Sequence, residues 1–173
     1  MHYEKTTLEW ARLQARDRAD KPAFVTPVRT WTFAQTDAFS NRIAQGLLAM
    51  GVGRGDRVAI LTKQTVECLA LMLAAQKIGA VCMPVNWRLA APEIAYVVDH
   101  GESKLLVADA EFLPQVAHLE LAHVKLRRVT DRAVDGGPRL LADWAAGHED
   151  RDPGYDGQPD DTALQLYSSG TTG

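Results

Sequence analysis

The sequence predicts an α/β protein with a mainly parallel sheet and helices on both faces. Strand-like runs alternate along the chain with helical patterns of ten to fifteen residues, which implies βαβ units. The runs 57–61, 81–85 and 104–108 are apolar apart from Arg57 and Lys104 at their starts, as strands covered on both faces are. A length of 173 residues, of which 46% are apolar and 24% charged, is ordinary for a globular domain with its own core.

The first third of the chain predicts two capped helices around a pair of short strands. Residues 6–9 and 32–35 have the spacing of capping boxes, so a helix should follow each. The first helix should reach about residue 19, and the second should stop at Gly51, because glycine tolerates the left-handed backbone at a helix end. Between them, 23–25 and 29–32 read as two strands around a turn.

The rest of the chain continues the alternation of strand and helix. Glycines 51, 53 and 55 follow a helix and precede a strand, the wrong order for a dinucleotide-binding turn. Segment 146–161 is acidic and rich in Gly and Pro, so it is expected to be a surface loop. Strands are expected at 57–61, 81–85, 104–108, 126–130 and 162–167, and helices at 66–78, from Pro92 onward, at 111–121 and at 140–146.

Charge and composition exclude several classes of protein. A net charge of −3 and a pI near 5.9 give no basic stripe for a nucleic acid. No apolar run is long enough to span a bilayer, and the N-terminus does not read as a signal peptide. Cys68 and Cys82 lie in apolar segments and are expected in the core, which fits a reducing compartment and a cytoplasmic protein.

The chemistry-bearing pattern is at the end of the chain. Four hydroxyls and two glycines follow the expected strand 162–167: Ser168, Ser169, Gly170, Thr171, Thr172 and Gly173. A flexible backbone leaving the carboxyl edge of a sheet can turn several N–H groups toward a phosphate. A merely polar chain end is the alternative, and the Walker spacing is absent.

These residues, read with other stretches, resemble the adenylate-forming (AMP-binding) superfamily, which includes acyl-CoA synthetases. Tyr167-Ser-Ser-Gly-Thr-Thr-Gly173 is similar to its phosphate loop. The resemblance extends over the chain from about Leu8. Its other parts are Thr30-Trp-Thr-Phe33, Gly51-Val-Gly-Arg-Gly-Asp-Arg-Val-Ala-Ile60, Ala74-Ala-Gln-Lys-Ile-Gly-Ala-Val81, Pro84-Val-Asn-Trp-Arg-Leu89 and Glu93-Ile-Ala-Tyr-Val-Val98.

The resemblance implies that residues 1–173 are the N-terminal part of the large AMP-binding domain, an incomplete subdomain that lacks the C-terminal lid. It implies an ATP-dependent ligase in which a carboxylate attacks the α-phosphate and a thiol then displaces AMP. The substrates and cofactors implied are a carboxylic acid, ATP, Mg²⁺ and CoA. Residues 168–173 would hold the ATP phosphates. The chain supplies no expected catalytic residue, so these 173 residues alone should be inactive.

Substrate and partners stay open at this point. Residues 88–93 resemble bacterial fatty-acyl-CoA ligases, which favours a medium- or long-chain fatty acid. An aryl or cinnamoyl acid and carrier-protein adenylation are alternatives, and a non-catalytic α/β binding module is an alternative of another class. A homodimer is possible. Asn86 and Arg88 could meet a phosphate or CoA, or only complete a loop. The five histidines lack metal-site spacing, so no metal site is expected.

Overall fold

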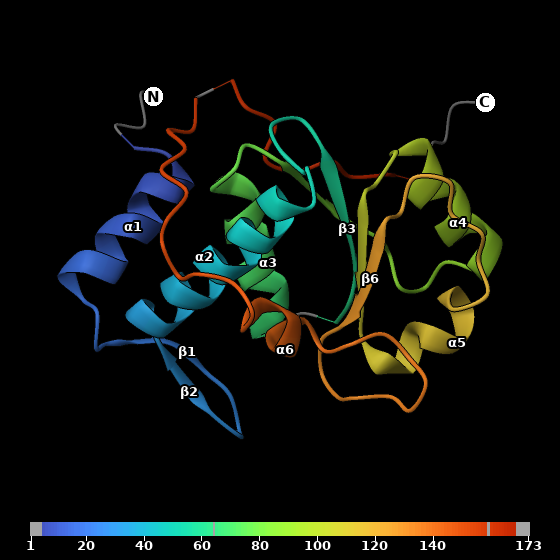
Figure 1. Ribbon diagram of the computed structural model, residues 1–173, viewed down its shortest axis with the longest axis horizontal. Coiled ribbons are helices and arrows are strands. Elements are labelled where there is room, and N and C mark those ends of the chain that lie inside the picture. Colours follow the sequence, from blue (N-terminus) through green and yellow to red (C-terminus); the bar gives the residue numbers. More distant parts are fainter. Residues whose placement is uncertain (1–4, 64, 159, 169–173) are drawn as a thin grey trace.

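The computed structural model describes residues 5–63, 65–158 and 160–168, and its centre is a four-stranded parallel sheet (Figure 1). The strand order is β4-β3-β5-β6, and each neighbouring pair is parallel. The α/β fold class with a mainly parallel sheet is therefore confirmed. The strands are β3 (Arg57–Leu61), β4 (Val81–Pro84), β5 (Leu105–Ala108) and β6 (Leu126–Val129).

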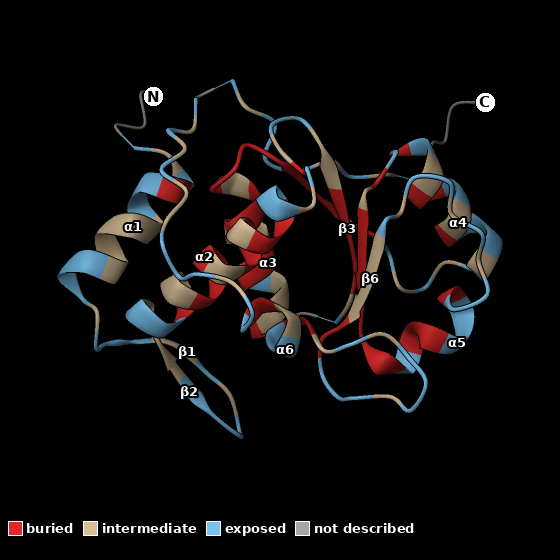
Figure 2. Ribbon diagram, in the orientation of Figure 1, coloured by how far each residue is buried: buried red, intermediate tan, exposed pale blue. Residues whose placement is uncertain are grey.

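Two apolar clusters lie on opposite faces of this sheet. Side chains alternate along a strand, so Val58 and Ile60 of β3 face one cluster while Ala59 and Leu61 face the other. The first cluster is closed by α2 (Phe33–Ala49), α3 (Val66–Gln76) and α6 (Leu141–Ala145). The second is closed by α4 (Ala91–His100) and α5 (Leu113–Val116). Burial on both faces explains the apolar character of β3, β4 and β5, whereas β6, which carries Arg127 and Arg128, is mostly half-buried (Figure 2).

The N-terminal helices begin where their capping boxes predict. In α1 (Thr7–Asp17) the Thr6 hydroxyl accepts from the N–H of Glu9 at 3.2 Å, and the Glu9 carboxylate reaches back to the N–H of Thr6. A second capping box, between Thr32 and Gln35, opens α2. Between these helices β1 (Pro22–Val25) and β2 (Thr30–Thr32) pair antiparallel, as the sequence predicts.

Helix α4 starts one residue earlier than expected. Ala91 is its first residue and Pro92 its second, a place where proline's missing N–H is not needed. Ala90 has no side-chain acceptor, so the Glu93 carboxylate instead accepts from the Ala90 N–H at 2.7 Å.

The helix expected at 111–121 is wrong in length. The chain makes only a 3₁₀ turn, η1 (Ala110–Phe112), followed by α5, which ends at Val116. The Arg127 guanidinium on β6 donates to the carbonyls of Val116, at 2.8 Å, and Ala117, at 3.1 Å, and also to that of Leu119. A longer helix would need the Val116 and Ala117 carbonyls for its own N–H groups, so an arginine on another element ends it.

The strand expected at 162–167 is also wrong. Only Leu164 forms a bridge, parallel to Cys82 of β4. The Cys82 N–H donates to the Ala163 carbonyl at 3.0 Å, and the Gln165 N–H donates to the Cys82 carbonyl at 2.9 Å. The next bond of this ladder would need an N–H from Pro84, which has none. The ladder therefore stops after one residue.

Segment 146–158 contains no helix or strand. We call its part from 150 to 158 the strap. It runs across α1 and α2 before the chain returns to the edge of the sheet (Figure 1).

Truncating a side chain on the buried face of α2 should destabilise the protein more than truncating one on its exposed face. Ile43 is fully buried in the first cluster, and Leu48 of the same helix is 42% exposed. We expect Ile43→Ala to lower the free energy of unfolding by about 2–5 kcal/mol, because it removes packed methylenes and leaves a cavity. Leu48→Ala should cost less than about 1 kcal/mol. Urea denaturation measures both changes, and equal losses would contradict this assignment of the two faces.

Candidate functional site

The candidate site is the hydroxyl- and glycine-rich loop after Tyr167. Ser168 is described by the structure and is exposed. Ser169, Gly170, Thr171, Thr172 and Gly173 lie outside the described residues. Their expected contacts with phosphate stay a prediction, and the structure bears on how the chain reaches them.

The segment before the loop is fixed to the sheet and to α4. The bridge at Leu164 is parallel, so the chain runs past it in the direction of β4. A 2.7 Å hydrogen bond joins the Tyr167 hydroxyl to Nδ1 of His100, and the Gln165 amide donates to the same hydroxyl oxygen at 3.1 Å. Ligands of open parallel α/β sheets bind beyond the carboxyl edge of the sheet, and the placement of residues 168–173 in that region stays a prediction.

A buried carboxylate holds the strand ends at this edge together. Asp109 follows β5 and accepts from the Lys63 N–H at 2.7 Å and from the Thr130 hydroxyl. Burial raises the pKa of Asp109, and both hydrogen bonds oppose that rise. The ends of β3, β5 and β6 are thereby linked. The sequence analysis did not single out this residue, although an acid directly after an apolar strand is the signal that marks it.

Two cations lie around Trp87 at the same edge. The Arg88 guanidinium is 4.3 Å from the centre of the indole ring, and the Lys63 ammonium is 5.2 Å from it. Lys63 also pairs with Glu111 at 2.8 Å, whereas Arg88 forms no ion pair with any carboxylate of the described chain. Asn86 accepts from the Arg88 N–H at 3.0 Å, so its side chain completes a local turn.

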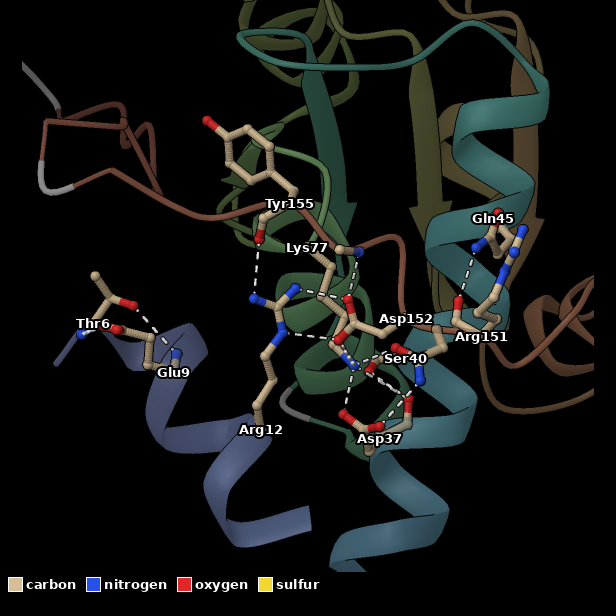
Figure 3. Close-up of polar contacts among 12 residues, drawn as sticks. Thr6, Glu9, Arg12, Asp37, Ser40, Gln45, Lys77, Arg151, Asp152 and Tyr155 are labelled. Atoms are coloured by element: carbon tan, nitrogen blue, oxygen red, sulfur yellow. Dashed lines mark hydrogen bonds and ion pairs between the residues drawn. The ribbon is translucent and has the colours of Figure 1, made fainter. Parts of the chain in front are cut away.

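The strap is anchored by a buried network of charges (Figure 3). Lys77, at the end of α3, is fully buried, and its ammonium lies 2.6 Å from the Asp37 carboxylate and 4.0 Å from that of Asp152. Arg12 of α1 binds both carboxylate oxygens of Asp152, at 2.7 and 2.8 Å. A bidentate pair of this kind fixes orientation as well as distance. Three helices and the strap therefore meet at one set of charges.

Further contacts continue along the strap. Side-chain amides of α2 donate to its carbonyls, Asn41 to Asp150 at 2.9 Å and Gln45 to Arg151 at 2.8 Å. The Tyr155 ring lies against Gly79, where an added Cβ would approach it to 2.9 Å. The Tyr155 hydroxyl also donates to Asp161, which follows the strap in the chain, at 2.7 Å. The chain is thus held on the way to its bridge with β4.

The network shifts the pKa of its members in ways that follow from burial. Burial lowers the pKa of Lys77, and the hydrogen bond to Asp37 opposes this in part. For Asp152, burial alone would raise the pKa, but hydrogen bonds from Arg12 and from the Gly154 N–H lower it on balance. Burial raises the pKa of the Cys82 thiol to about 12, so this cysteine is an unreactive part of the core.

A cavity of about 550 Å³ lies at the opposite, amino edge of the sheet. Its arginines are already paired, Arg57 with Glu102 at 2.6 Å and Arg54 with Asp161 at 2.9 Å. The cavity adjoins the segment that leads to Ser168, because His100 and Gln165, which bind the Tyr167 hydroxyl, line it. The donors that an anionic ligand would need there are, however, already occupied. We do not assign it to the phosphate site.

Neither a metal-binding cluster nor a membrane-spanning helix is found among the described residues. Among the described residues, no three His, Cys, Asp or Glu side chains are grouped so that they could hold a metal ion. No helix in the part of the chain covered by the structure has the length and apolarity needed to cross a bilayer.

Comparison with known proteins gives one consistent result. The family model described as AMP-binding enzyme matches residues 11–173. A 3-hydroxybenzoate–CoA ligase of Aromatoleum sp. (strain CIB) is 39% identical over 165 residues, which are 92% of this chain and 31% of that protein. A fatty acid–[acyl-carrier-protein] ligase, ScoC, of Streptomyces coeruleorubidus is 35% identical over 98% of this chain and 31% of its own length.

A solved structure agrees with these relatives. The N-terminal domain of FACL13 from Mycobacterium tuberculosis superposes with a TM-score of 0.84 at 31% identity, covering 98% of this chain and 42% of that one. The chain thus spans about a third of the length of the curated relatives above.

Removal of the buried ammonium should destabilise the protein. We expect Lys77→Met to lower the free energy of unfolding by about 3 kcal/mol, because Asp37 and Asp152 lose their shared cation. The matched control is Lys63→Met, whose pair with Glu111 is about half exposed and should contribute less than about 1 kcal/mol. Chemical denaturation of both variants checks this, and similar losses would show that Lys77 is not the organising charge.

The Asp152 pair should also appear in the pH dependence of stability. Because its pKa in the folded protein is below the ordinary value of 3.8, the carboxylate stabilises the fold above that pH. This contribution is lost as the pH falls through the lower folded value. The stability difference between wild type and Asp152→Asn should therefore shrink below about pH 3.8. Arg12→Gln should behave alike, and parallel stability curves from pH 6 to pH 2 would contradict the assignment.

Proposed function

The chain belongs to the AMP-binding enzyme family, and on this premise we propose that its parent protein is an ATP-dependent acid–thiol ligase. The observation that carries the proposal is the position of Ser168. It begins a hydroxyl- and glycine-rich loop, which the chain approaches in the direction of β4, and parallel sheets bind ligands beyond the carboxyl ends of their strands. An exposed hydroxyl at the start of that loop fits a phosphate ligand.

In this proposal residues 168–173 hold the β- and γ-phosphates of ATP. Their N–H and hydroxyl donors face the oxygens on which negative charge grows as pyrophosphate leaves. ATP supplies the adenylyl group: an oxygen of the acid forms a bond to the α-phosphorus, and the bond to pyrophosphate breaks. In the second half-reaction a thiol sulfur bonds to the acyl carbon and AMP departs. ATP, Mg²⁺ and CoA are the cofactors we propose for the whole enzyme.

For the acid we propose a medium- or long-chain fatty acid. The support is the likeness of residues 88–93 to fatty-acyl ligases and a relative, matched over nearly the whole chain, that is named for fatty acids. An aromatic acid is the second candidate, because a hydroxybenzoate ligase is the more identical of the two relatives. An acyl carrier protein is the alternative thiol acceptor, as the name of the fatty-acid relative indicates.

We also infer a cytoplasmic setting, which the two free cysteines support. A homodimer stays a prediction. The rival to the whole proposal is a binding module without catalysis, and it differs from the ligase in one measurable respect. Only a ligase exchanges pyrophosphate into ATP when its acid is present.

The test is acid-dependent ATP–pyrophosphate exchange by the protein from the complete reading frame, with saturated fatty acids of graded length, benzoates and cinnamates. We expect exchange with fatty acids, and none from residues 1–173 alone. Thr171→Val should lower the exchange rate by about 10²-fold, the scale of one lost transition-state donor. Thr162→Val, an exposed threonine just before the bridge, is the matched control and should keep full exchange.

The outcomes separate the candidates. Exchange with benzoates alone would move the assignment to an aryl ligase. A folded complete protein that exchanges with no acid would favour the binding module. Full exchange by Thr171→Val would contradict phosphate binding by the loop, but it would not contradict the ligase activity.

A further inference from the structure

Two arginines lie side by side at the edge of the sheet farthest from β4. Val129 of β6 forms a parallel bridge with Leu140, and the Val129 N–H donates to the Arg139 carbonyl at 3.2 Å. The residues before the bridge, Arg128 and Arg139, are therefore opposite each other, and their side chains leave the same face. This is the face of α6, where the Arg128 guanidinium is 5.5 Å from the centre of the Trp144 ring.

No carboxylate of the described chain neutralises this pair. The contacts within hydrogen-bonding distance are to carbonyls: Arg128 to that of Arg127 at 2.7 Å, and Arg139 to that of Asp143 at 3.5 Å. The Nε of Arg128 is buried and has no hydrogen-bond acceptor. Seven other arginines are in ion pairs, namely Arg12, Arg16, Arg42, Arg54, Arg57, Arg132 and Arg151. Arg18, Arg29, Arg88 and Arg127 form no ion pair within the described chain either, but only Arg128 has a buried donor without an acceptor there.

This arrangement opposes folding in the bare chain. Like charges directly opposite on neighbouring strands repel, and a buried donor without an acceptor loses its hydration without compensation. Burial, and then the charge of Arg139, lower the pKa of Arg128. Trp144 offsets part of this through its ring face. A bound anion would remove both unfavourable effects at once.

We propose that Arg128 and Arg139 form a binding site for the phosphate group of a phosphorylated small molecule. Two guanidinium groups supply forked donors that match the oxygens of a phosphate. A phosphate monoester carries nearly two negative charges at neutral pH and so balances both cations, which a single carboxylate does not. The indole beside Arg128 forms an apolar wall of the site.

This site is distinct from the loop at 168–173. The described segment that leads to the loop pairs with β4 at Leu164, whereas the arginine pair lies at β6, and β4 and β6 are the outer strands of the sheet. Three strand spacings, roughly 14 Å, separate β4 from β6. The inference does not depend on the proposed ligase activity, and its test uses neither ATP nor an acid substrate.

The experiment titrates inorganic phosphate into the isotope-labelled 173-residue chain at constant ionic strength and neutral pH. The arginine Nε–Hε signals report binding, and the signal lost in Arg128→Gln identifies Arg128. We expect a saturable shift of that signal. Arg139→Gln should weaken phosphate binding by about tenfold or more, as the loss of a charge-assisted partner does. The matched control is Arg132→Gln, an exposed arginine paired with Asp131, and it should bind as wild type does.

Acetate at the same ionic strength is the monoanion control, and thermal unfolding with and without phosphate is the second readout. Phosphate, but not acetate, should raise the melting temperature of wild type and of Arg132→Gln. If Arg128→Gln does not fold, Arg139→Gln carries the test, since Arg139 is exposed. An equal phosphate response in Arg139→Gln and wild type, or an equal response to acetate and phosphate, would overturn the proposal.

Discussion

The buried ammonium of Lys77 is the constraint on which the arrangement of the N-terminal half depends. A charge without water must be paired, so two carboxylates have to reach it, from α2 and from the strap. The second carboxylate, Asp152, is in turn held by Arg12 of α1. Segments far apart in the sequence are thereby brought together by a few atoms, and the strap has one path across the helices.

The strap determines where the following residues meet the sheet. Beyond it, the backbone meets the outer edge of β4 through a single bridge, since Pro84 has no N–H to extend the ladder. Tyr167 then makes the last described anchor, to His100. Ser168 is placed by these contacts and not by a regular strand. The described approach to the candidate phosphate loop is thus held by side-chain contacts added to a single backbone bridge.

Sequence reasoning succeeded where the signal is local. Capping boxes and continuous apolar runs depend on neighbouring residues, so α1, α2 and the buried strands were predicted closely. The helix at 111–121 and the strand at 162–167 were wrong because the deciding groups, Arg127 and Pro84, lie on other elements. Lys77 follows an apolar helical run, and its partners, Asp37 and Asp152, are far from it in the sequence, so no local pattern predicts the ion pairs. Of the candidate site, the motif named six residues, and the structure describes the first of them.

The pair between Arg12 and Asp152 joins residues 140 positions apart. A ribosome adding about 5–20 residues per second needs roughly 7–28 s to make that stretch. Helix α1 leaves the ribosome before α2 and α3, yet it cannot be clamped by Asp152 until the strap has been made. Its anchoring to the strap is therefore a late step of folding during synthesis, and in that interval α1 can contact α2 and α3 but not yet Asp152.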